Sequence, residues 1–234
     1  MGFQQKKFMN STITQTKNAL IIFIKFPELG KVKTRLALST NNVFALEIYK
    51  LLAENIFHEA EKLDCKTLIF YVDSTNEQKV KNWVNKDFLY LPQNGKDLGE
   101  KMLNAFEQVK SKGFEKILII GSDVPDISKD LITNSLNELN KTDVVISPSD
   151  DGGYSLLGLK EVNPFLFQNI EWSTQKVLNQ TIEAIKQNKL SLTKLKTLND
   201  IDTKEELIEW ISKTKNMSLK TKILKIAERN NIIL

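Results

Sequence analysis

The stretch 19-ALIIFIKFPELGKVKTRLA-37 decides the fold of this chain. Its first six residues are all apolar, without the alternation of a strand that faces water on one side, and this predicts a strand buried on both faces. The run ends in a loop in which Gly30 is followed closely by Lys31, Lys33 and Arg35. Open α/β sheets bind ligands where their parallel strands end. We therefore expect this loop to hold the phosphate groups of a nucleotide.

Apolar runs of strand length alternate with helical patterns along the rest of the chain, which predicts a mostly parallel sheet covered by helices on both faces. The run at 154–159 follows its neighbour too closely for a helical crossover, so we expect a mixed sheet. The expected strands are 19–25, 67–72, 88–93, 116–121, 143–147, 154–159 and 190–198, and the expected helices are 43–62, 76–85, 98–112, 128–140, 174–188, 203–213 and 217–229. The pattern predicts one α/β domain, a three-layer α/β/α sandwich over residues 18–234, after a flexible leader at 1–17.

The composition excludes several classes of protein and site. The net charge of +4 arises from 33 basic and 29 acidic residues mixed along the 234-residue chain, which argues against a dedicated nucleic-acid binder. No apolar run approaches the roughly 18 residues of a membrane span. The single cysteine, Cys65, and the single histidine, His58, exclude an internal disulfide and a zinc site of clustered Cys and His. We expect a cytoplasmic protein whose chemistry rests on carboxylates, amines, hydroxyls, backbone amides and a hard metal ion.

The basic loop at 25–36 matches neither a Walker A motif nor a dinucleotide-binding glycine motif. Gly30 permits close approach of the backbone to a ligand, and Lys33 and Arg35 can make charge-assisted hydrogen bonds to phosphate oxygens. The alternative is a solvated basic turn. Phosphate binding is the hypothesis that we develop.

The loop 121-GSDVPD-126 follows an apolar strand directly, so Asp123 emerges at the carboxyl end of that strand. A carboxylate beside a phosphate-binding loop suits Mg²⁺ or Mn²⁺, which bind through one or two carboxylates and the phosphates of the ligand. We predict that Asp123 is a metal ligand. Asp126 or Ser128 could instead serve as the N-cap of the next helix, and for Asp126 we favour capping.

Two later loops carry acids that are open to more than one interpretation. In 147-SPSDDGGYSLLG-158 the glycine pair could let a ligand approach the backbone while Asp150 or Asp151 binds hydroxyl groups, but a tight hairpin would also use these residues. In 199-NDIDTKEEL-207 either Asp200 or Asp202 could face the crevice, although an N-cap explains much of this motif.

Taken together, these motifs resemble those of a bacterial glycosyltransferase family in the nucleotide-diphospho-sugar transferase superfamily, which has the GT-A fold and includes members linked to arsenosugar biosynthesis. The motifs occur in order between 19 and 212 and read K-x-P-x-x-G-x-x-K-T-R-L, G-S-D-x-P-D, D-G-G-Y, W-S-T and D-I-D-T. The chain resembles more distantly the guanylyltransferases of molybdenum-cofactor and coenzyme F420 biosynthesis.

The resemblance implies roles for particular residues. Asp123 and Asp202 would bind the metal, with Asp123 also serving catalysis. Lys101 stands where the family usually has arginine, which keeps the charge but loses the bidentate fork. The implied nucleotide and phosphate contacts are Gly30, Lys33, Thr34, Arg35, Gln93 and Lys101, and the implied substrate contacts are Gly152, Gly153, Tyr154 and Trp172. In the reaction that we expect, Asp150 and Asp151 are catalytic: their loop orients the acceptor hydroxyl, and one of the two acids takes its proton.

We expect a glycosyltransferase, dependent on Mg²⁺ or Mn²⁺, that uses a nucleotide-diphosphate sugar and a small-molecule acceptor. The first alternative is a nucleotidyltransferase acting on a nucleoside triphosphate and a phosphorylated acceptor. The second is a nucleotide-binding protein without catalysis. The basic segment 218–234 could cover the sheet edge, pair with a second copy in a homodimer, or do neither.

Overall fold

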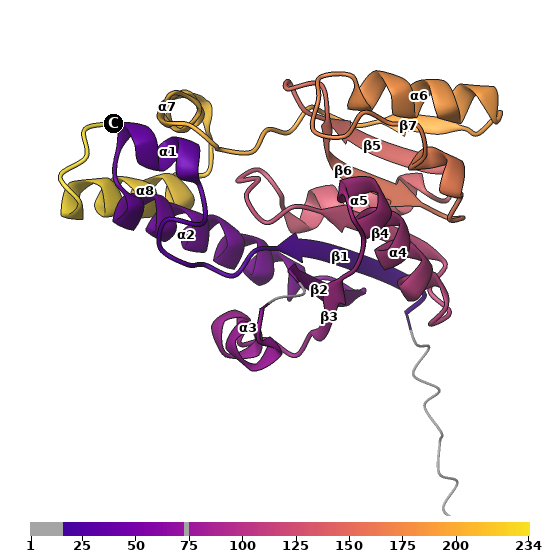
Figure 1. Ribbon diagram of the computed structural model, residues 1–234, viewed down its shortest axis with the longest axis horizontal. Helices are drawn as coiled ribbons and strands as arrows, with labels where there is room; N and C mark the ends of the chain where they lie inside the picture. Colours follow the sequence, from indigo (N-terminus) through magenta and orange to yellow (C-terminus); the bar gives the residue numbers. More distant parts are fainter. Residues whose placement is uncertain (1–15, 73–74) are drawn as a thin grey trace, which may run out of the picture.

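The computed structural model describes residues 16–72 and 75–234, so all but the last two residues of the expected leader at 1–17 lie outside the described residues. The chain forms one α/β unit with a seven-stranded sheet (Figure 1). The strands are β1 (Asn18–Ile24), β2 (Lys66–Val72), β3 (Leu89–Gln93), β4 (Lys116–Ile120), β5 (Val144–Pro148), β6 (Tyr154–Leu159) and β7 (Leu192–Lys194). The helices are α1 (Thr34–Ser39), α2 (Asn42–Ala60), α3 (Glu77–Val84), α4 (Leu98–Lys110), α5 (Lys129–Glu138), α6 (Val177–Gln187), α7 (Lys204–Lys213) and α8 (Met217–Arg229), with a 3₁₀ turn η1 (Pro164–Leu166).

The strand order β3-β2-β1-β4-β6-β5-β7 confirms a mixed, mostly parallel sheet. Only β6 runs antiparallel, and it pairs with both β4 and β5. The last strand is shorter than the expected 190–198. Beyond Lys194 the chain still follows β5, but only through separate bonds such as Leu195 N to Ile146 O at 2.8 Å, so the ladder ends early.

Alternate residues of the buried strands face two different layers of helices. In β1, Leu20, Ile22 and Ile24 join a core with α2, α3 and α5. Ala19 and Ile21, on the other face of the strand, join a second core with α4, η1 and α6. This is the three-layer α/β/α sandwich expected from the unbroken apolar runs.

A third core joins helices that are distant in the sequence. Leu36 of α1, Phe44 of α2, Leu207 of α7 and Ile223 of α8 belong to this cluster. In Figure 1, α1, α7 and α8 gather around the end of α2 that projects beyond the sheet. The C-terminal helix therefore packs on α2 instead of covering the sheet edge. Because α1 follows the basic loop and α7 follows the 199–203 segment, the third core anchors both segments to one small unit.

The helix termini test two of the capping expectations. Ser128, and not Asp126, caps α5, since its hydroxyl accepts a hydrogen bond from Leu131 N. Thr203 caps α7 in a capping box with Glu206, as the sequence pattern predicts. No helix in the described parts of the chain is long and apolar enough to cross a membrane.

Candidate active site

A cavity of about 400 Å³ lies at the carboxyl ends of β1, β2, β3 and β4, and we call it the first cavity. Both predicted metal ligands and every predicted nucleotide contact except Gly30 line it: Lys33, Thr34, Arg35, Gln93, Lys101, Asp123 and Asp202. Gly30 lies next to the lining residue Lys31, and its φ of 75° lies in the left-handed region that glycine tolerates best. The basic loop and the acidic loop therefore meet in one cavity.

Lys33 is the centre of this arrangement. Its Nζ donates to Asp123 Oδ2 and to Asp202 Oδ1, both at 2.7 Å, and its side chain is only 2% exposed. Burial alone would lower the pKa of this ammonium, but the two carboxylates outweigh burial and the pKa is raised. Lys33 is therefore a fixed internal cation.

The backbone of Lys33 is also unusual. Its φ of 47° places a non-glycine residue in the left-handed region immediately before α1. Such a conformation is unfavourable by itself and persists where surrounding contacts stabilise it. The two carboxylate contacts are such interactions, and they link the start of α1 to segments 90 and 169 residues away.

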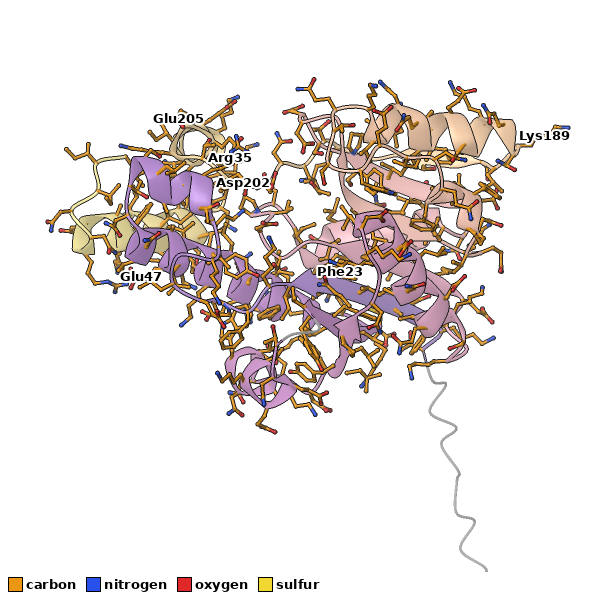
Figure 2. All side chains as sticks on the ribbon, viewed as in Figure 1. Phe23, Arg35, Glu47, Lys189, Asp202 and Glu205 are labelled. Carbon is orange, nitrogen blue, oxygen red and sulfur yellow. The ribbon has the colours of Figure 1, made fainter. Side chains whose placement is uncertain are left out.

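Arg35 supplies a more accessible charge. Its side chain is 63% exposed, and its Nη1 lies 3.6 Å from Asp202 Oδ2. Figure 2 shows Arg35 and Asp202 next to each other at the N-terminal end of α1. A guanidinium held at only one edge by a carboxylate retains donors for a phosphate.

Three carboxylates converge beside Lys33. Oxygen atoms of Asp123, Asp200 and Asp202 lie within 4.8 Å of one another, and all three residues are half-buried. Such a set of oxygen donors fits a hard divalent cation, because Mg²⁺ and Mn²⁺ bind carboxylate oxygens. Burial, together with the charges of Asp123 and Asp202, raises the pKa of Asp200 to about 6. Asp200, which the sequence left undecided, is thus a third member of the predicted cluster.

One side chain that the sequence did not indicate, Tyr49, holds the strand ends in place. The Tyr49 hydroxyl donates to Lys25 O at 2.8 Å, accepts from Lys25 N at 3.0 Å and lies 3.0 Å from Ser122 Oγ. This links the end of β1 to the loop that carries Asp123. In the sequence Tyr49 is one apolar position among many in α2, so no local pattern distinguishes it.

Gln93 has a comparable role at the neighbouring strands. Its Nε2 donates to Ile24 O at 3.2 Å and to Phe70 O at 2.9 Å, which ties β3 to β1 and β2. Its amide nitrogen is therefore occupied by the protein, and the remaining polar atom of the side chain, Oε1, is the one available to a ligand.

Asp150 and Asp151 line a different cavity, of about 670 Å³, which we call the second cavity. It lies between the β5–β6 loop, the 196–201 segment and α7, and Asp200 also lines it. Because Asp123 and Asp202 line the first cavity, the carboxylate cluster forms the boundary between the two cavities.

The residues after Asp151 form a hairpin that lies outside both linings. Pro148 pairs with Tyr154 across the turn, as in the hairpin alternative. Gly152 has a φ of 86°, and a Cβ there would lie 2.3 Å from Gln175 O, so the glycine permits close packing of two backbone segments. Gly153 N donates to Asp151 Oδ1 within the same turn at 3.0 Å.

Two aromatic residues of the predicted substrate side are packing residues. Tyr154 and Trp172 lie against the second core. The Trp172 indole covers Gly99 of α4 so closely that a Cβ on Gly99 would lie 2.1 Å from Trp172 Nε1. Trp210 of α7 lines the second cavity, and its Nε1 donates to Asp126 Oδ1 at 3.1 Å. No local pattern in the sequence distinguishes Trp210.

Two known proteins are similar to this chain over more than half of its length. A protein of Desulfovibrio desulfuricans described as a "putative nucleotide-diphospho-sugar transferase" is 30% identical, with a TM-score of 0.87 over 92% of this chain and 96% of that chain. The 2-phospho-L-lactate guanylyltransferase of Methanocaldococcus vulcanius is 29% identical over 149 residues, and the match spans 62% of this chain and 63% of that enzyme.

A more distant structure shows the fold alone. The 4-diphosphocytidyl-2C-methyl-D-erythritol synthase of Anaerococcus prevotii is 13% identical, with a TM-score of 0.53 over 83% of this chain and 96% of that chain. These similarities confirm the expected fold of the nucleotide-diphospho-sugar transferase superfamily.

One family model matches half of this chain. The family model described as "Uncharacterized protein conserved in bacteria (DUF2064)" matches residues 56–174, which include β2 to β6 and the loop that carries Asp123. The basic loop and Asp202 lie outside that match. This chain belongs to the DUF2064 family.

Proposed function

We propose that this protein is a divalent-cation-dependent transferase that binds a nucleotide donor in the first cavity and passes one group of that donor to a small acceptor. Glycosyl transfer from a nucleotide-diphosphate sugar is the first candidate reaction. The observation that carries the proposal is the position of buried Lys33 between Asp123 and Asp202, in a cavity that also presents exposed Arg35.

The charges of the first cavity support an anionic ligand. Its 17 lining residues include five basic ones and two acidic ones. The excess of positive charge attracts a diphosphate, and Arg35 and Lys101 have donors for its oxygens. Buried Lys33 holds Asp123 and Asp202 in fixed positions, so the carboxylates are arranged before the ligand arrives.

Asp123, Asp200 and Asp202 would hold the divalent cation. Mg²⁺ or Mn²⁺ bound there would neutralise part of the charge that develops on a leaving diphosphate. The chain itself contributes the orientation of the donor, through the basic loop, and a polar second cavity next to the reacting group.

In glycosyl transfer an acceptor oxygen forms a bond to the anomeric carbon while the bond from that carbon to the diphosphate oxygen breaks. The nucleoside diphosphate leaves with the bonding electrons, and the hydroxyl proton passes to a carboxylate that lines the second cavity. The same cavities could serve nucleotidyl transfer, in which a phosphorylated acceptor attacks the α-phosphorus of a nucleoside triphosphate and pyrophosphate leaves. The similarity to a guanylyltransferase favours keeping this second candidate.

Binding is the first test. We would measure thermal unfolding with Mn²⁺ and a panel of nucleoside diphosphates, nucleoside triphosphates and nucleotide sugars. A nucleotide at 100 times its dissociation constant stabilises the folded state by about 2.7 kcal/mol. For a chain of this length we expect a rise in Tm of about 5–10 °C.

The carboxylate cluster provides matched variants. Asp123→Asn and Asp202→Asn should each remove most of the Mn²⁺-dependent part of this rise, whereas Asp87→Asn, an exposed aspartate outside the cavity, should keep it. If Asp123→Asn retained the full Mn²⁺-dependent rise, the proposed site would be wrong.

The product decides the reaction. Release of a nucleoside diphosphate from a nucleotide sugar would establish glycosyl transfer or donor hydrolysis, and release of pyrophosphate from a triphosphate would establish nucleotidyl transfer. A protein that binds nucleotides but releases neither product with any acceptor would have a binding role alone.

A further inference from the structure

The two cavities differ sharply in charge. The first cavity is lined by five basic and two acidic residues, whereas the 14 residues of the second cavity include six acidic residues and three lysines. A polyanion is therefore attracted to one side of the carboxylate cluster and repelled on the other. The first cavity therefore favours anionic ligands, and the second cavity favours uncharged or cationic ones.

The second cavity also has an aromatic surface. Trp210 lines it, and its indole is oriented by the hydrogen bond from Nε1 to Asp126 and by packing against the third core. An indole held in this way offers an apolar face to a ring whose edge carries hydroxyl groups. Cations are also favoured over an aromatic face.

Hydroxyl-binding groups surround this surface. Asp150 and Asn199 are held together, since Asn199 Nδ2 donates to Asp150 Oδ2 at 2.6 Å and Asp150 N donates to Asn199 Oδ1 at 2.9 Å. Glu209 is paired with Lys213 at the α7 side of the cavity. These carboxylates have remaining lone pairs, which accept hydrogen bonds from hydroxyl or ammonium groups but not from a phosphate or carboxylate ion.

We infer that the second cavity is the acceptor site and that it selects a hydroxylated ring compound that is uncharged or cationic, against the phosphorylated form of the same compound. The inference rests on the proposed function, because it takes the first cavity as the donor site. It deepens that function by favouring glycosyl transfer to a hydroxyl group over nucleotidyl transfer to a phosphate.

The test uses one ring at three charges. Glucose, glucosamine and glucose 6-phosphate would be added separately to the full chain with diamagnetic Mg²⁺, and saturation-transfer NMR would report binding of each. We expect saturation transfer from the protein to glucosamine and to glucose, and little or none to glucose 6-phosphate. Equal or tighter binding of glucose 6-phosphate, or no binding of any of the three, would overturn the inference.

Variants of α7 assign the binding to the second cavity. Trp210→Leu should weaken glucose and glucosamine binding about tenfold, the loss that corresponds to about 1.4 kcal/mol of stacking. Trp210→Phe, which retains an aromatic ring and most of the bulk, should weaken binding much less. Unchanged binding in a folded Trp210→Leu variant would place the sugar elsewhere and overturn the inference.

A charge variant tests the selectivity. Glu209→Gln removes one acid and frees the Lys213 ammonium, so glucosamine should bind about threefold to fivefold more weakly and glucose 6-phosphate correspondingly more tightly. Glu107→Gln, an exposed glutamate on α4, should change neither affinity. The same response in both variants would overturn the electrostatic explanation.

The nucleotide measurements separate this inference from the proposed function. Trp210 does not line the first cavity, so Trp210→Leu should keep the Mn²⁺-dependent rise in Tm with nucleotide. Nucleotide binding without the predicted order among the three sugars would refute the acceptor site alone. The predicted order without nucleotide binding would refute the proposed transferase and leave a sugar-binding cavity.

Discussion

Replacing Asp200 with asparagine should stabilise the metal-free protein, and the gain should depend on pH. Half-buried Asp200 lies beside Asp123 and Asp202, and its pKa rises from an ordinary 3.8 to about 6 because of burial and the two neighbouring charges. The folded state therefore resists ionisation of this carboxyl more than the unfolded chain does.

The direction of the pH dependence follows from linkage. Well below pH 3.8, at about pH 3, the carboxyl is protonated in both states, and its stabilising contribution is fully present. Between 3.8 and about 6 the unfolded chain loses its proton first, so stability falls as the pH rises, and above about 6 the loss is complete. One pKa unit corresponds to about 1.4 kcal/mol, which gives a limit of about 3 kcal/mol.

Water screens a half-buried carboxylate in part, so we expect Asp200→Asn to raise the free energy of unfolding by about 1–3 kcal/mol at pH 7.5. At pH 4 most of this gain should be absent, because the carboxyl is protonated in the folded state and only partly ionised in the unfolded chain. Urea denaturation with EDTA at both pH values measures the difference, and Asp87→Asn, an exposed aspartate, serves as the control. A variant no more stable than the parent at pH 7.5, or one with an equal gain at pH 4, would refute the electrostatic account of this cluster.

Three further variants test the site and its supports. Lys33→Met should lower the free energy of unfolding by about 1–3 kcal/mol, because two half-buried carboxylates lose their ammonium partner. Mn²⁺ alone should then raise the Tm of this variant more than it raises the Tm of the parent protein. An equal rise would contradict the role of Lys33 as an internal cation for the carboxylates. Tyr49→Phe should lower the free energy of unfolding by about 1–3 kcal/mol in urea denaturation, since Lys25 backbone groups lose their partner; no change would contradict the link between β1 and the Asp123 loop. Gly152→Ala should lower the free energy of unfolding by about 2–4 kcal/mol, because the new Cβ clashes with Gln175 and the φ is positive. Gly113→Ala, at a φ of 90° but with open space around it, should lower it by only about 1–2 kcal/mol. Equal losses would contradict the explanation that Gly152 permits close packing of two backbone segments.

Local patterns in the sequence determined the layers of this protein. The unbroken apolar run at 19–24 predicts a strand buried on both faces, and β1 has that environment. Because parallel strands end at one edge of a sheet, the sequence also predicted that the loop after β1 and the loop after β4 would meet there. Lys33 and Asp123 do meet, at 2.7 Å.

Tertiary packing decided what the loop patterns left open. The hairpin after β5 directs Asp150 and Asp151 to the second cavity, and Trp210, not Trp172, lines that cavity. Periodicity records only which face of an element is buried, whereas the position of a loop depends on what its flanking elements pack against. The third core brings α1 and α7 together across 164 intervening residues, and no pattern of a few residues could specify that contact.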